Sequence, residues 1–210
     1  DWQDFGNGAL GDFGCHILDP VFTALRITGA PTDIKCSYHS GMNDEVWPAQ
    51  NIVEYKFPGT DLTGKTLPIT WYDGNRLPKE RGKHLPRNER VPASGSLFIG
   101  DEGTLVLPHV GAPKLHPQEK YADYAYQPAD DQDHFHGWLD GIISGKQPSD
   151  GFDYAGPLTE SALLGIVSHR VGNKKLEWDA KKLQATNSKP GIFSFFFINL
   201  SGIKLTYVNN

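Results

Sequence analysis

Residues 8–38 have the sequence GALGDFGCHILDPVFTALRITGAPTDIKCSY, and the spacing of their apolar side chains changes part-way along. In the first part, apolar side chains recur every three or four positions, at Leu10, Phe13, Ile17, Val21, Phe22 and Leu25. This spacing predicts an amphipathic helix over residues 8–25, which Pro20 is expected to kink or split. From Ile34 the period becomes two, which predicts a β-strand.

The rest of the chain continues the pattern of strands followed by helices. Strands are expected over 34–38, 52–57, 67–72, 96–100, 103–107 and 176–178, with the fourth and fifth forming a hairpin. Helices are expected over 133–144, with Asp130 or Asp131 as its cap, and from Pro157 to about 171. Residues 77–92 and 108–130 are expected to be loops. This order predicts an α+β fold with an open, mainly antiparallel sheet and helices packed on one face.

Composition limits the classes of function. The chain has 210 residues with 38% hydrophobic side chains, enough for a sizeable core, and a net charge of −5, which argues against a nucleic-acid binder. It has no run of about 18 apolar residues, so no membrane span is expected. Its two cysteines, Cys15 and Cys36, are expected to be buried thiols, although a single bridge between them stays open. The cellular compartment, cytoplasmic or periplasmic, stays open as well.

Asp12 and His16 form the most specific candidate for chemistry. Their spacing places both on one face of the predicted helix, with Asp19 nearby. A carboxylate beside an imidazole can orient the ring as a general base that takes a proton from an alcohol. The alternatives are a surface ion pair or a histidine satisfied within the core. A metal site would need a third ligand, which the spacing does not supply.

Three other patterns have structural alternatives. Gly6-Asn7-Gly8-Ala9-Leu10-Gly11 matches the spelling of a dinucleotide fingerprint, but no apolar strand precedes it, so we interpret it as a glycine-rich helix entry. The acidic and histidine-containing run over 130–136 is interpreted as a helix start, not a metal site. The five Trp and eight Tyr could stack on sugar rings, or fill the core.

These residues carry a resemblance to a known family. The segments over 2–20, 69–74, 100–105, 157–165 and 176–179 resemble the C-terminal domain of the glucose–fructose oxidoreductase, inositol dehydrogenase and MocA (Gfo/Idh/MocA) family. The stretch Gly11-Asp12-Phe13-Gly14-Cys15-His16 is similar to a bacterial branch of that family. We therefore expect a Gfo/Idh/MocA-like substrate and oligomerisation domain over 1–190.

The resemblance implies an activity and a site. Family members oxidise or reduce a secondary alcohol of a sugar or cyclitol with NAD or NADP, which a separate Rossmann domain binds. By position, Asp12 and His16 match the family's catalytic Asp and His, and Trp2, Asn7, Asp12 and His16 are the expected substrate-binding residues. The expected partners are a sugar or cyclitol and a second copy of the chain, bound through the sheet.

Two departures shape the expectation. The chain shows no Glu-Lys-Pro motif and no Rossmann domain, and it begins Asp1-Trp2-Gln3, so we interpret it as the substrate-binding half of an oxidoreductase that is inactive alone. Residues 191–210 carry four of the eleven Phe and almost no charge, an atypical tail that is interpreted as non-native or divergent. The alternatives are a stand-alone carbohydrate-binding or oligomerisation module, a truncated relic, and an NAD-dependent glycosidase.

Overall fold

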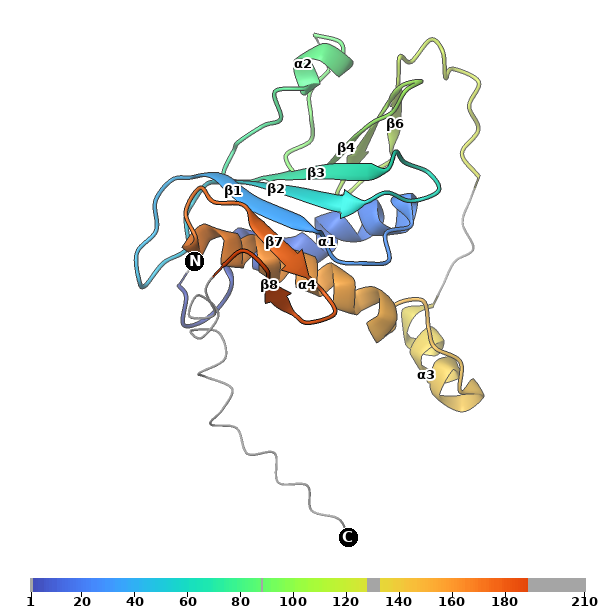
Figure 1. The fold of residues 1–210 in the computed structure, drawn as a ribbon. Helices are drawn as coiled ribbons and strands as arrows, with labels where there is room; N and C mark the ends of the chain where they lie inside the picture. The colour runs from blue at the N-terminus through green and yellow to red at the C-terminus, as the bar shows by residue number, and fades with distance from the viewer. Residues whose placement is uncertain (1, 88, 128–132, 189–210) are drawn as a thin grey trace.

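A computed structural model describes residues 2–87, 89–127 and 133–188 (Figure 1). The first half contains α1 (Gly8–Leu25), β1 (Asp33–His39), β2 (Asn51–Pro58), β3 (Thr66–Tyr72), α2 (Arg81–His84) and β4 (Gly95–Ile99). The second half contains β5 (Thr104–Pro108), β6 (Lys114–His116), α3 (His134–Ser144), α4 (Phe152–Arg170), β7 (Leu176–Asp179) and β8 (Gln184–Ala185).

The strands form two antiparallel sheets, and the fold is α+β as expected. The larger sheet has the order β3-β2-β1-β7-β8, so the last strands return beside the first. The smaller sheet has the order β4-β5-β6 and stands behind the larger one in Figure 1. Helices α1 and α4 lie together against one face of the larger sheet (Figure 1).

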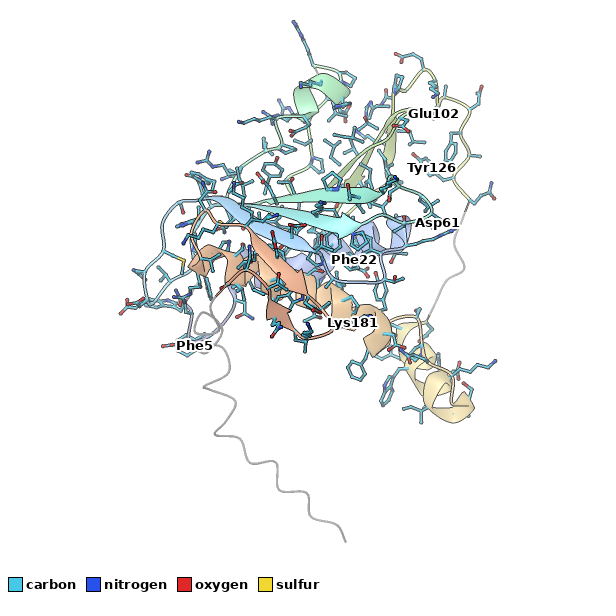
Figure 2. The ribbon with its side chains drawn as sticks, in the orientation of Figure 1. Phe5, Phe22, Asp61, Glu102, Tyr126 and Lys181 are labelled. Carbon is cyan, nitrogen blue, oxygen red and sulfur yellow. The ribbon has the colours of Figure 1, made fainter. Side chains whose placement is uncertain are left out.

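The core lies between the larger sheet and these two helices. Alternating burial along β2 sends Val53, Tyr55 and Phe57 toward the helices, while Glu54 and Lys56 face outward. Phe22 of α1, labelled in Figure 2, is fully buried beneath the sheet, and its ring lies 5.6 Å from that of Phe57 in an edge-to-face contact. Such burial of large apolar side chains is the main favourable term in folding.

Small residues let α1 and α4 approach closely. A side chain at Gly14 would meet Ala162 at 3.2 Å. At Gly165, a side chain would collide with the hydroxyl of Tyr55 and with Leu10. The helix pair therefore holds α1, with Asp12 and His16, firmly on the sheet.

Several local expectations differ from the structure. Pro20 does not split α1, which continues through it to Leu25, because Val21 and Phe22 beyond it are buried. Helix α4 begins at Phe152, before Pro157, and the loop over 108–130 contains β6. The cap of α3 is Asp133, whose side chain accepts a hydrogen bond from the backbone N–H of His136 at 2.8 Å. Asp130 and Asp131 lie outside the described residues.

The cysteines are only partly as expected. Both are free thiols, and Cys36 is buried, which raises its pKa to about 11. Cys15 is exposed because it lies on the side of α1 that faces away from the sheet, so the prediction of a buried thiol is wrong there. No described helix is long and apolar enough to cross a membrane. The atypical tail over 191–210 lies outside the described residues.

Candidate substrate site

Helix α1 presents Asp12 and His16 to solvent. The face of α1 that carries Leu10, Ile17 and Val21 is buried against the sheet and α4. Asp12 and His16 lie on the other side and are exposed. The structure therefore agrees with the helical spacing from which both residues were proposed, and excludes the alternative of a histidine satisfied within the core.

The smaller sheet packs against α1 next to His16. The hydroxyl of Ser96 on β4 donates a hydrogen bond to the backbone carbonyl of Ile17, at 3.3 Å. An open pocket of about 190 Å³ lies at this junction. Its lining includes His16, Ile17, Pro20, Ser96, Leu107 and His109. The pocket thus joins one face of α1 to the end of the β4–β5 hairpin.

His109 is the second imidazole of this pocket. Its ring centroid lies 5.7 Å from that of His16, and both rings contact Phe13, at 5.2 Å from His109 and 5.5 Å from His16. The backbone N–H of His109 donates to the carbonyl of Ser94 at 2.9 Å, which positions the residue directly after β5. Two imidazoles and the Ser96 hydroxyl give the pocket donors and acceptors suited to a hydroxylated ligand.

Asp12 and Asp19 do not pair with His16. Among the described residues, no hydrogen bond or ion pair joins either carboxylate to the imidazole. Asp19 instead accepts a hydrogen bond from Tyr154 of α4, at 2.6 Å. The side chain of Asp12 points from the same exposed face as His16, one helical turn before it. The ring of His16 therefore takes its orientation from Phe13 and His109.

Trp2 and Asn7 lie at the other end of α1. Trp2 is 58% exposed and forms an isolated antiparallel β-bridge with Val46. Asn7 is the N-cap residue of α1, and its side chain makes no capping hydrogen bond to the helix. With a rise of 1.5 Å per residue, Asn7 is about 13 Å along the helix from His16. The structure thus brings Asp12 and His16 onto one face, but of the four expected substrate-binding residues only His16 lines the pocket, and Trp2, Asn7 and Asp12 do not.

The glycine-rich entry to α1 does not fit a dinucleotide. Gly8 has a φ of +70°, and a side chain there would meet Trp47 at 3.0 Å. The Trp47 indole donates a hydrogen bond to the carbonyl of Gly6 at 2.7 Å, and a side chain at Gly11 would meet Ile166 at 3.1 Å. Protein atoms already occupy the space that a pyrophosphate would need. These glycines therefore allow the start of α1 to pack closely against Trp47 and Ile166.

The described residues form no metal centre. Within these ranges, no group of three or more His, Cys, Asp or Glu could hold a metal ion. His136 on α3 pairs with Asp133 at 3.1 Å, and the ring of His134 packs on Phe135. These contacts agree with the interpretation of this segment as a helix start.

Sequence reasoning missed His109. It follows Leu107-Pro108 at the end of a predicted strand, and no spacing relates it to His16. The one available signal was that a histidine at the end of a hairpin strand can reach a neighbouring element. Which element it reaches depends on how the hairpin docks, and that is a property of the packed structure.

Comparisons with known proteins identify no relative. No family model matches the chain, and no curated protein is significantly similar to it. The family resemblance therefore stays a prediction, and the pocket geometry is the basis on which a function can be proposed.

Proposed function

We propose that this chain is the substrate-binding part of an NAD(P)-dependent oxidoreductase that acts on a secondary alcohol of a sugar or cyclitol. The observation that supports this proposal is the pocket between α1 and the smaller sheet, whose lining includes the imidazoles of His16 and His109, in edge-to-face contact with ring centroids 5.7 Å apart. A cavity of this size accommodates a small polyol ring. Ile17, Pro20 and Leu107 offer an apolar surface in the pocket on which the ring's C–H groups can pack.

His16 is the proposed acid–base group. A neutral imidazole can take the proton of a hydroxyl within hydrogen-bonding reach, and return it in the reverse direction. His109 and the Ser96 hydroxyl can hold neighbouring hydroxyls of the same ring. Asp12 lies on the same exposed face of α1, one turn before His16 and outside the pocket lining, and its proposed role is to accept a hydrogen bond from a further hydroxyl of the bound ligand.

The nicotinamide is not assigned to these residues. Because the glycine-rich entry is filled by Trp47 and Ile166, these glycines are not proposed as a dinucleotide site. The cofactor is instead proposed to bind a separate Rossmann domain, as the family resemblance implies. The part proposed for this chain is binding the alcohol and holding its proton at His16.

The test is a ligand titration followed at the two imidazoles. Isotope-labelled protein is titrated with cyclitols and aldoses up to about 50 mM, and the ring C–H signals of His16 and His109 are followed by NMR. Saturable shifts at both rings are expected, with dissociation constants in the millimolar range typical of small polar ligands. Asp12→Asn and His16→Asn should each weaken binding by at least about five-fold, roughly 1 kcal/mol.

The matched control is His84→Gln, which changes an exposed histidine on α2, outside the pocket. Binding that is unchanged by both Asp12→Asn and His16→Asn would favour a stand-alone carbohydrate-binding module. No shift at either ring with any sugar or cyclitol would overturn the proposal. Reduction of NAD by this chain alone would contradict the expectation that it holds only half of the active site.

A further inference from the structure

Helix α3 carries five large apolar side chains that are exposed on one face. Its side chains at Phe135, Trp138, Leu139, Ile142 and Ile143 are exposed by 82%, 66%, 45%, 60% and 75%. They recur every three or four positions and so lie on one side of the helix. No residue of α3 is buried, and Figure 1 shows the helix standing away from the sheet, beyond the start of α4.

Gly141, on the other side of α3, is covered by the loop that follows the helix. A side chain at Gly141 would meet the carbonyl of Lys146 at 3.0 Å and the ring of Pro148 at 3.2 Å. The loop after the helix therefore covers Gly141, and the apolar face is left outward. The N-cap residue Asp133 defines the start of α3. Gly145, which has a left-handed backbone conformation, defines its end.

This arrangement is unfavourable for a helix without a partner. An isolated helix of 11 residues is marginal in water, because most helical stability in proteins comes from packing of the apolar face. Exposed patches above a few hundred Å² mark interaction sites. Phe152, which is 92% exposed at the start of α4, adds a sixth large side chain at this end of the molecule.

The exposed area is enough for a stable dimer. A large apolar or aromatic side chain has about 150–250 Å² of surface. At the exposures above, the six side chains offer roughly 800 Å², which is the contribution of one partner to an interface of standard size. A second copy of the chain would supply an equal apolar area, as a two-fold symmetric contact requires.

The charges at the helix ends favour an antiparallel pair. Asp133 lies at the N-terminal end of α3 and Lys146 follows its C-terminal end, while the apolar face between them carries no charge. In an antiparallel pair, each Asp133 approaches the Lys146 of the other copy. The two helix dipoles then point in opposite directions, which is also favourable. The outer face of the larger sheet, by contrast, is polar, with Glu54, Lys56 and Thr70 exposed.

We propose that two copies of this chain associate through the apolar faces of α3, packed antiparallel about a two-fold axis. Phe135 of one copy then faces Ile142 of the other, and the two Leu139 side chains lie close to the axis. This contact is separate from the candidate substrate pocket and does not depend on the function proposed for it. It also differs from the sheet-mediated contact that the family resemblance implies.

The first test is the mass of the full chain in solution. Sedimentation equilibrium between 1 and 200 µM should give a dimer with a dissociation constant in the micromolar range. Ile142→Asp and Trp138→Ser should each raise that constant at least 50-fold, because they place a polar group at the centre of the contact. Neither change removes a buried side chain, so the melting temperature of the core should stay within about 2 °C.

Two controls locate the contact. Leu62→Asp changes a hydrophobic side chain that is 53% exposed, in the β2–β3 turn, and should leave the dimer intact. Thr70→Lys, on the outer face of the sheet, should also leave it intact. A dimer that Thr70→Lys disrupts and Ile142→Asp does not would assign the contact to the sheet and overturn the proposal.

The second test is cross-linking near the axis. In a Cys15→Ser background, which removes the exposed native thiol, Leu139→Cys should form an intermolecular disulfide on mild oxidation, whereas Leu62→Cys should not. A chain that is monomeric at 200 µM and does not cross-link at position 139 would show that two copies do not associate through this face. That outcome would overturn the proposal.

Discussion

The phenolic oxygen of Tyr154 on α4 lies 2.6 Å from the carboxylate of Asp19 and 2.8 Å from the hydroxyl of Thr23, both on α1. Burial, and then the hydrogen bond to the Asp19 carboxylate, raise the pKa of Tyr154 to about 12. The contact fixes the C-terminal half of α1 against α4. It also occupies Asp19, which leaves the His16 imidazole to its contacts with Phe13 and His109.

Replacing Tyr154 with Phe should lower the free energy of unfolding by about 1 kcal/mol, because a hydrogen bond to a charged group at a partly exposed site is lost. The native pKa is raised above the unfolded value, so this stability is present below pH 10 and is lost as the pH rises toward 12. Urea unfolding of the wild type and of Tyr154→Phe between pH 8 and 11.5 measures both effects. Tyr124→Phe, at an exposed tyrosine, is the control, and equal alkaline profiles for all three proteins would contradict the assignment.

His169 should make the fold sensitive to acid. It is 5% exposed on α4, and neither ring nitrogen has a hydrogen-bond partner among the described residues. Burial, followed by the neighbouring His39 and Arg170, lowers its pKa to about 4. The native pKa lies below the unfolded value of about 6.5, so the native state should lose stability as the pH falls from 6.5 toward 4, by at most about 3 kcal/mol.

This acid sensitivity can be measured by thermal unfolding from pH 7.5 to 4. His169→Gln removes the titrating ring and should flatten the profile between pH 6.5 and 4.5, even though the substitution lowers stability at pH 7.5. His84→Gln, on the exposed helix α2, should keep the wild-type profile. A profile that His169→Gln leaves equally steep would show that other groups cause the acid loss.

The Tyr55 hydroxyl should be dispensable. It is buried under Gly165 without a hydrogen-bond partner among the described residues, and burial raises its pKa strongly. Because a buried hydroxyl without a partner costs about 1–3 kcal/mol, Tyr55→Phe should leave stability unchanged or raise it by about 1 kcal/mol. Chemical denaturation measures this, and a loss above 1 kcal/mol would indicate a partner for the hydroxyl.

Gly165 should be sensitive to any side chain. Gly165→Ala places a methyl group against the Tyr55 hydroxyl and Leu10, and should cost about 2–3 kcal/mol through overpacking of the α1–α4 contact. The same change in the Tyr55→Phe background should cost about 1 kcal/mol less, because one of the two collisions is relieved. Gly156→Ala, where no atom lies within 4 Å, is the matched control.

Asp73 should stabilise the end of the β2–β3 pair. Its carboxylate accepts hydrogen bonds from the backbone N–H of Asn51 at 2.5 Å, from the Asn51 amide at 3.0 Å and from the Trp71 indole at 3.0 Å. Asp73→Ala leaves these donors unpaired and should cost about 2–4 kcal/mol, whereas Asp73→Asn keeps one acceptor and should cost less. Asp101→Ala, at an exposed turn, should change stability by under 0.5 kcal/mol. Equal effects of Asp73→Ala and Asp101→Ala would contradict a structural role.

Local spacing predicted much of the fold. The three-and-four spacing from Leu10 to Leu25 and the alternation of β2 both have the expected form, because each pattern reflects which side of a single element is buried. Element ends were less well predicted. Pro157 was expected to begin α4, but the helix starts at Phe152, since the residues before a proline can stay helical when packing supports them.

The candidate site was predicted only in part. Asp12 and His16 share a helix face, as spacing implies, but their carboxylate and imidazole are not paired. The residue that the structure places beside His16 is His109, which directly follows β5 of the smaller sheet. Spacing within one element cannot reveal a contact between two elements that dock through tertiary packing.

The type and order of the main elements, and the α+β class, follow from side-chain periodicity alone, because each element buries one face whatever its neighbours are. The position of His109 beside His16 and the outward apolar face of α3 follow only from packing. The spacing of α3 is that of a core helix, yet the following loop covers Gly141 and not the apolar face. Periodicity shows that a face will be buried, but not by which surface, since that depends on how elements distant in the sequence meet in space.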